Sequence, residues 1–142
     1  MTKRNFDISV QQRADLLEAY RKVAPICLTQ KQAWEHTVKS PAPRYYVSRK
    51  QAFQKVVKMI KGDFSEVNAM KPLRQSMYYS LYQKTLQMID KREFAGKSLH
   101  YIMQFVVCQP APSFFIQPYA LMMIFPIAKK EDKERMMKNR KE

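Results

Sequence analysis

Apolar residues recur along the chain at intervals of three and four, and prolines and glycines separate the periodic stretches. This spacing is typical of amphipathic helices. Only two glycines occur in 142 residues, and a β-rich fold needs more of them for its turns. We therefore predict an all-α protein of about six helices. The predicted helices cover residues 9–24, 29–40 and 48–61, then 72–91, a segment that begins at Ser98, and finally 118–125.

Several of these helices carry start and stop signals. Ser9, Thr29 and Ser48 each precede a glutamine by three residues, which is the spacing of a capping box. Pro72 suits a first helical turn, where no amide hydrogen is needed, and Gly62 suits a helix end. In the helix of residues 72–91, the expected buried side consists of Leu73, Met77, Leu81, Leu86 and Ile89.

One motif occurs twice, at a separation of 69 residues. Residues 38–47 and 107–116 both read Val-x-x-Pro-Ala-Pro, then any residue, two aromatic residues and a β-branched one. The similarity continues outside the motif, because Thr29 matches Ser98 as a hydroxyl cap and Pro118 falls at a helix start. A repeat at fixed separation indicates one structural unit used twice, although chance similarity is the alternative. We predict two tandem helix-turn-helix-like repeats that share one core, each with helix, helix, extended Pro-Ala-Pro turn and helix.

The charge of the chain is distributed unevenly between these repeats. The formal net charge is +14. Residues 98–128 contain no charged side chain of Asp, Glu, Lys or Arg, whereas residues 38–62 contain basic residues and no acidic one. We divide the chain into a basic first repeat at 1–62, a linker at 63–71, an apolar second repeat at 72–128 and a charged tail at 129–142. The tail either extends into solvent as a helix or adds contacts to phosphates.

This division suggests different partners for the two repeats. The excess of positive charge favours a polyanionic partner, although the same charge would also serve solubility. The helix of residues 118–125 is hydrophobic on every side and is therefore expected to be buried. We expect residues 98–128 to join protomers of a homo-oligomer or to bind a protein partner. Alternatively, residues 118–125 form a core helix wrapped by helices 9–24 and 72–91.

The strongest candidate site is the helix of residues 48–61. Lys50, Gln54, Lys58 and Lys61 follow one another at spacings of four, four and three, and therefore share one face. Basic side chains suit phosphates and glutamine amides suit base edges, although a lysine-rich face is often only solvated. The predicted nucleic-acid-binding residues are Arg44, Arg49, Lys50, Gln51, Gln54, Lys55, Lys58 and Lys61.

Tyrosines give an alternative mode of binding. Tyr45 and Tyr46 follow the first Pro-Ala-Pro sequence, and Tyr78, Tyr79 and Tyr82 belong to the next helix. Aromatic rings beside lysines can stack on the bases of single-stranded nucleic acid. Equally, such tyrosines can be core residues with a hydrated hydroxyl group.

No sequence pattern indicates catalysis. His36 and His100 have no partners at the spacing of metal ligands. Two glycines cannot form a phosphate-binding loop, and no nucleophile elbow is present. We expect no enzyme activity, no metal and no cofactor.

The sequence also bears on location. Cys27 and Cys108 are too few for a disulfide scaffold. Residues 1–7 lack an apolar signal core, and the apolar run of residues 119–128 is short and contains Pro126. We expect no membrane span and a cytoplasmic, intracellular protein.

Residues 29–61 resemble the helix-turn-helix modules of DNA-binding proteins from phages and mobile elements, including small terminase subunits. The resemblance rests on a capped helix, the turn from Ser40 to Ser48, and a basic following helix. It implies a non-catalytic protein that binds double-stranded DNA, with helix 48–61 in or near the major groove. The rival interpretation is a structural or scaffold protein of a phage or mobile element that does not read nucleic acid.

Overall fold

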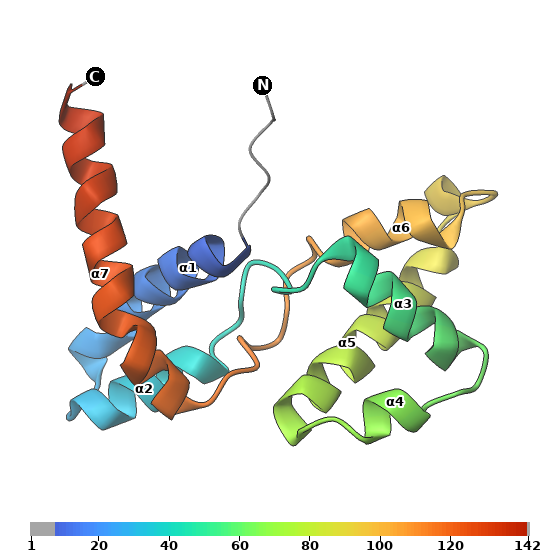
Figure 1. The fold of residues 1–142 in the computed structure, drawn as a ribbon, viewed down its shortest axis with the longest axis horizontal. Helices are drawn as coiled ribbons and strands as arrows, with labels where there is room; N and C mark the ends of the chain where they lie inside the picture. Colours follow the sequence, from blue (N-terminus) through green and yellow to red (C-terminus); the bar gives the residue numbers. More distant parts are fainter. Residues whose placement is uncertain (1–7, 142) are drawn as a thin grey trace. The chain divides into compact units, whose positions relative to one another are not determined.

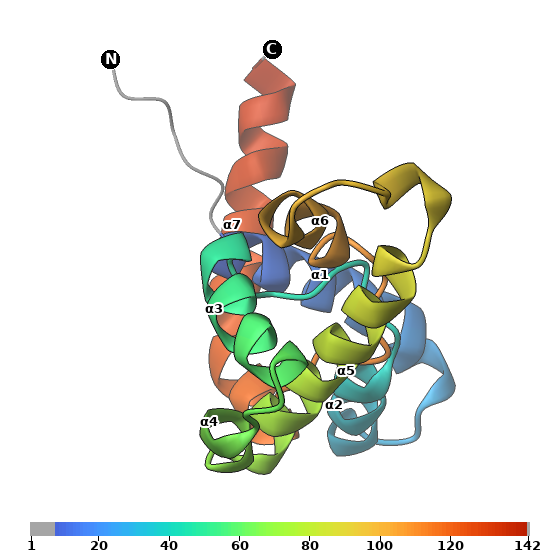
Figure 2. The same ribbon diagram turned by 90° about the vertical axis from the view of Figure 1, so that its right-hand side faces the viewer.

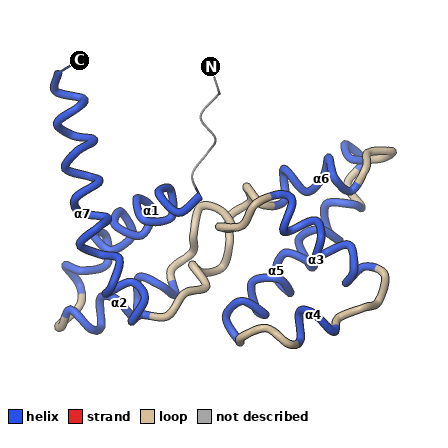
Figure 3. The backbone as a smooth tube through the Cα atoms, viewed as in Figure 1, coloured by secondary structure: helices blue, strands red, loops and turns tan. Residues whose placement is uncertain are grey.

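The computed structural model describes residues 8–141, and over this range the chain consists of helices and loops with no strand (Figure 3). The predicted all-α fold is therefore confirmed. Seven α-helices occur in the described range: α1 (Ile8–Val23), α2 (Gln30–Lys39), α3 (Arg49–Ile60), α4 (Ser65–Asn68), α5 (Pro72–Ile89), α6 (Leu99–Val106) and α7 (Pro118–Lys141). Short 3₁₀ turns at Ala24–Ile26 and Arg92–Phe94 follow α1 and α5. Residues 1–7 and 142, which the predicted first repeat and tail include, lie outside the described range.

The hydroxyl caps explain where three helices begin. The side-chain oxygens of Thr29, Ser48 and Ser98 each accept a backbone N–H from three residues on, at 3.1 Å. Each bond satisfies one of the amides that a first helical turn leaves without a partner. The cap predicted at Ser9 is wrong, because α1 begins at Ile8 and Ser9 lies inside it.

The end of α3 is a Schellman motif. Gly62 has a φ of 94° and its N–H donates to the carbonyl of Met59, while Asp63 donates to the carbonyl of Lys58. A side chain at position 62 would be strained in this left-handed conformation, so glycine is the expected residue. The predicted stop at Gly62 is therefore confirmed.

The chain folds into two compact units whose limits differ from the predicted division at residues 62 and 72. Residues 41–115 form a central unit that contains α3, α4, α5 and α6. The two ends of the chain, residues 8–40 and 116–141, form a terminal unit that contains α1, α2 and α7 (Figure 1). The stretch predicted as a linker, 63–71, belongs to the central unit and contains α4, in which Val67 is buried.

The repeats themselves have the predicted order of elements, but their third helices are exchanged. The first repeat supplies α1, α2 and α3, and the second supplies α5, α6 and α7, each with a Pro-Ala-Pro segment before the third helix. In the central unit α3 packs against α5 and α6 (Figure 2). In the terminal unit α7 packs against α1 and α2. Each unit thus combines two helices of one repeat with the last helix of the other.

The two Pro-Ala-Pro segments meet inside the central unit. The N–H of Ala42 donates to the carbonyl of Ala111, and the N–H of Ala111 donates to that of Ala42, both at 2.9 Å. Proline has no N–H, so each alanine uses the only donor of its Pro-Ala-Pro sequence. Equivalent residues of the two repeats therefore lie opposite each other. The ring of Tyr46 stacks on that of Phe114 beside this bridge, with centroids 5.7 Å apart.

Burial follows the repeat. Positions 69 residues apart are buried in both copies, although their side chains differ in size. The buried pairs are Leu16 and Thr85, Ala33 and Ile102, Thr37 and Val106, Val38 and Val107, Ala42 and Ala111, Tyr45 and Phe114, Ala52 and Leu121, and Met59 and Ala128. The hydroxyls of the two buried threonines donate to backbone carbonyls one turn earlier, at 2.7 Å, so neither polar group is left unsatisfied.

The buried side predicted for α5 is partly wrong. Leu86 and Ile89 are each 39% exposed. The α5 residues that are buried are Met77, Tyr78, Leu81, Thr85 and Met88. Apolar residues lie on both sides of this helix, so its periodicity alone does not fix which side faces α3 and α6.

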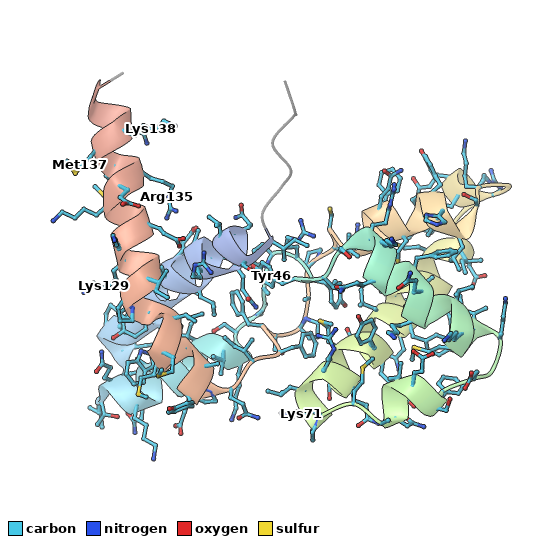
Figure 4. The ribbon with its side chains drawn as sticks, in the orientation of Figure 1. Tyr46, Lys71, Lys129, Arg135, Met137 and Lys138 are labelled. Carbon is cyan, nitrogen blue, oxygen red and sulfur yellow. The ribbon has the colours of Figure 1, made fainter. Side chains whose placement is uncertain are left out.

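Helix α7 departs most from expectation. It continues through Pro126 into the predicted tail, as one helix of 24 residues. Leu121 and Ala128 are buried, but Tyr119, Met123 and Ile127 are exposed, so the helix is not buried on every side. Its packing partners are α1 and α2, so of the two helices named in the alternative expectation, 9–24 packs on it but 72–91 is replaced by α2. Lys129, Arg135, Met137 and Lys138 project from its later turns (Figure 4).

An ion pair joins α7 to α1, and changing its residues tests the packing of these two helices. Arg13 donates two hydrogen bonds to Glu131, both at 2.8 Å, across 118 residues of sequence. We expect Arg13→Glu or Glu131→Arg to lower the free energy of unfolding by about 1–2 kcal/mol. The reason is that this ion pair is bidentate and its side chains are about four-fifths buried.

The double variant with both charges exchanged should recover at least half of that loss in urea unfolding. The same exchange at the exposed pair Glu18 and Lys22 serves as the control and should change stability by less than about 0.5 kcal/mol. Additive losses at residues 13 and 131 would contradict the exchanged arrangement.

Candidate nucleic-acid interface

The solvent-facing side of α3 carries the predicted cationic residues. Ala52, Val56 and Met59 are buried, and α3 packs against α5 and α6. Their burial turns the opposite side of the helix to solvent. The residues on that side that are exposed are Lys50, Gln51, Gln54, Lys58 and Lys61. We call this set the α3 ridge.

The remaining predicted site residues are less accessible or lie elsewhere. Arg49 is exposed at the first position of α3. Lys55 is half-buried at the edge of the ridge. Arg44 is half-buried in the Pro-Ala-Pro segment, where its Nε donates to the carbonyl of Tyr45 at 2.9 Å. The structure therefore gathers all the predicted residues except Arg44 on α3 or its C-terminal cap.

One acidic residue that was not predicted, Glu66, faces this surface. Glu66 of α4 accepts a hydrogen bond from Lys55 Nζ at 2.6 Å, and its other carboxylate oxygen accepts one from Lys58 Nζ. Two of the predicted phosphate-binding lysines thus share one carboxylate, which offsets one of their two positive charges. The signal in the sequence was the glycine stop at position 62, which reverses the chain and brings Glu66 back towards α3.

The tyrosines proposed as base-stacking groups serve internal packing. Tyr45 and Tyr78 are buried core residues, and burial raises the pKa of both phenols, so they stay neutral. Tyr79 stacks on Phe64 with the rings nearly parallel and donates its hydroxyl to Asn68 at 2.7 Å. The structure contradicts the use of Tyr45 and Tyr78 as exposed stacking platforms.

A second exposed ridge occupies the equivalent position on α7. Tyr119, Met123, Ile127 and Lys130 lie 69 residues after Lys50, Gln54, Lys58 and Lys61, and all are exposed. With the neighbouring Met122, they form what we call the α7 ridge. The same side of the third helix is therefore cationic in the central unit and mostly apolar in the terminal unit.

Other chemistry is sparse in the part of the chain that the structure describes. Between residues 8 and 141, no three His, Cys, Asp or Glu side chains gather as metal ligands would. His100 stacks on Phe53, with ring centroids 3.9 Å apart. Cys27 is half-buried and Cys108 exposed, and each is a free thiol. Within the same range, the helices are too short or too polar to cross a bilayer.

Comparisons with protein-family models, curated proteins and solved structures gave no match to this chain. The resemblance to helix-turn-helix modules therefore stays a prediction. One observation bears on this resemblance. The two helices on which it rests, α2 and α3, belong to different units, and α3 packs against α5 and α6 of the second repeat.

Proposed function

We propose that this protein binds double-stranded DNA through the α3 ridge and catalyses no reaction. The observation that supports this is the exposure of Lys50, Lys61 and Arg49 on a helix without any acidic residue. The central unit as a whole has twelve basic and four acidic residues. A surface of this kind attracts the phosphate backbone and releases its counterions.

The form of α3 favours a duplex. A helix of 12 residues is about 18 Å long, and a helix fits the major groove, which is about 12 Å wide. Gln51 and Gln54 lie between the lysines, where their amides can donate to and accept from base edges. Because Tyr45 and Tyr78 are internal, single-stranded nucleic acid is the weaker alternative.

A salt titration tests this function. Fluorescence anisotropy with a labelled duplex should give a logarithmic salt slope of about −3, because Arg49, Lys50 and Lys61 can each displace one counterion. A flat slope, or no binding at low salt, would rule out the proposal. A single-stranded DNA or RNA of the same length should bind more weakly, and tighter binding would favour the alternative.

The α7 ridge favours a second function. Tyr119 is 68% exposed, Met123 58% and Ile127 49%, and an exposed apolar patch of this kind marks an interaction surface. We propose that the ridge joins copies of the chain. In the rival role, as a scaffold protein of a phage or mobile element, the ridge would be the functional surface and the charge of α3 would serve solubility.

Changing the ridge should dissociate the oligomer. We expect Met123→Ser with Ile127→Ser to shift the light-scattering mass from dimer to monomer, because the contact loses its apolar area. Leu28→Ser is the matched control, since Leu28 is also exposed in the terminal unit and lies outside the ridge. A monomeric wild-type protein would contradict self-association through α7. An oligomer that binds no DNA would favour the scaffold role.

A further inference from the structure

The contact between α3 and α4 has the chemistry of a phosphate site. Lys55 and Lys58 lie one turn apart on α3, and their ammonium groups each donate to a different oxygen of Glu66. A phosphodiester also presents two oxygens that share one negative charge, and lysine binds such groups as a point charge. The carboxylate therefore satisfies the two lysines in the way a backbone phosphate would.

Helix α4 is held in place to present Glu66. Val67 is buried, and the side-chain oxygen of Asn68 accepts hydrogen bonds from Gln75 and Tyr79 of α5, at 3.1 and 2.7 Å. Asp63 accepts from the backbone N–H and the hydroxyl of Ser65 at the start of the helix. These bonds lower the pKa of Asp63, so the carboxylate stays ionised near neutral pH.

A further cation, Arg74, shares the neighbour Tyr78 with Lys55. The guanidinium of Arg74 on α5 lies 5.5 Å from the centre of the Tyr78 ring. Both Arg74 and Lys55 act electrostatically on the Tyr78 hydroxyl, which is buried and has no hydrogen-bond partner among the described residues. Glu66 itself pairs with Lys55 and Lys58, and its side chain is 39% exposed, within reach of a competing anion.

We infer that Glu66 occupies the place of a nucleic-acid phosphate, and that duplex binding displaces it from Lys55 and Lys58. This inference rests on the proposed DNA binding. The exchange replaces one singly charged pair of oxygens by another, so neither lysine loses its partner. Since the phosphate must compete with an internal carboxylate, α4 restrains the affinity of α3 for DNA and reduces the number of counterions released.

The variant Glu66→Gln tests this role. It keeps the shape of the side chain and removes its charge, so both lysines become available to the duplex. We expect the variant to bind a labelled duplex about ten-fold more tightly at 0.1 M salt, with a salt slope steeper by about 1, because one negative charge is removed. Glu18→Gln is the control, because it changes the net charge equally from an exposed position on α1 in the terminal unit. Circular dichroism checks that both variants remain folded.

A second variant separates displacement from a general charge effect. Lys55→Gln with Lys58→Gln should weaken the binding of the wild-type protein less than that of Glu66→Gln, because in the wild-type protein Glu66 competes with the phosphate for both lysines. In the Glu66→Gln background, the same double change should abolish the gain. This non-additivity is what a shared site requires.

The outcomes distinguish this inference from the proposed function. If wild-type protein binds DNA and Glu66→Gln binds no better than Glu18→Gln, the inference is wrong while the proposed function stands. If the gain persists without Lys55 and Lys58, Glu66 acts only through net charge and the inference is again wrong. If neither wild-type protein nor Glu66→Gln binds at low salt, both fail. Tight binding by Glu66→Gln alone would support the inference in its strongest form.

Discussion

Replacing Leu121 with alanine should unfold the terminal unit while leaving the central unit folded. Leu121 is 1% exposed on α7 and is the largest buried side chain of that helix. Truncating such a residue costs about 2–5 kcal/mol, and this is a large part of the stability of a small unit. Without α7, the pair of helices α1 and α2 loses the partner that covers its apolar side.

The volumes of the buried residues make this cost high. In the terminal unit, α2 contributes the small Ala33 and α7 the large Leu121. In the central unit, α6 contributes the large Ile102 and α3 the small Ala52. Each unit thus combines one large and one small residue at these repeat positions, and Leu121→Ala leaves the terminal unit with two small ones.

Hydrogen exchange read by mass spectrometry locates the effect. Peptides from residues 8–40 should lose protection in Leu121→Ala, whereas peptides from residues 49–106 should keep it. Met136→Ala is the matched control, because Met136 lies on the same helix and is 54% exposed. Loss of protection in residues 72–106 instead would mean that α7 packs on the helices of its own repeat.

The helices were predictable because their signals are local. Three hydroxyl caps, the glycine stop at position 62 and the prolines at helix starts fix the boundaries without reference to the rest of the chain. The exchange of third helices was not predictable in this way. The exchanged arrangement and the arrangement without exchange use the same helices, the same caps and the same turns. They differ only in which pair of helices each third helix covers.

At one pair of buried repeat positions, side-chain volume favours the exchange. Without the exchange of third helices, Ala33 and Ala52 would belong to one unit, and Ile102 and Leu121 to the other. The first combination would lower the volume of buried side chains in its unit and the second would raise it, and both changes are destabilising in a close-packed core. Reading this from sequence requires knowing which helices form each unit, and that assignment comes only from the structure.

The candidate site was predictable to a similar extent. The helical phase set by Ala52, Val56 and Met59 was enough to turn the α3 ridge towards solvent. Glu66 was not found, because α4 has only four residues and therefore no periodicity to reveal it. The pairing of Lys55 and Lys58 with Glu66 therefore could not be predicted, since it depends on this single turn of helix.

Neutralising the two exposed ends of the α3 ridge should remove most DNA binding. We expect Lys50→Gln with Lys61→Gln to lower affinity for a duplex by about 10- to 100-fold at 0.1 M salt, since each lysine accounts for about 0.9 of the logarithmic salt slope. The slope itself should fall by about 2, leaving the contribution of Arg49 and any base contacts. Both lysines are exposed, so their replacement leaves the packing of α3 intact.

The control for this prediction removes the same charge from the other unit. Lys31→Gln with Lys39→Gln changes two exposed lysines of α2. If DNA responds only to the net charge of the protein, the two double variants should lose affinity and slope equally. If the α3 ridge is the binding surface, only the Lys50 and Lys61 variant should do so, because counterions are released where the phosphates are contacted and not over the whole molecule.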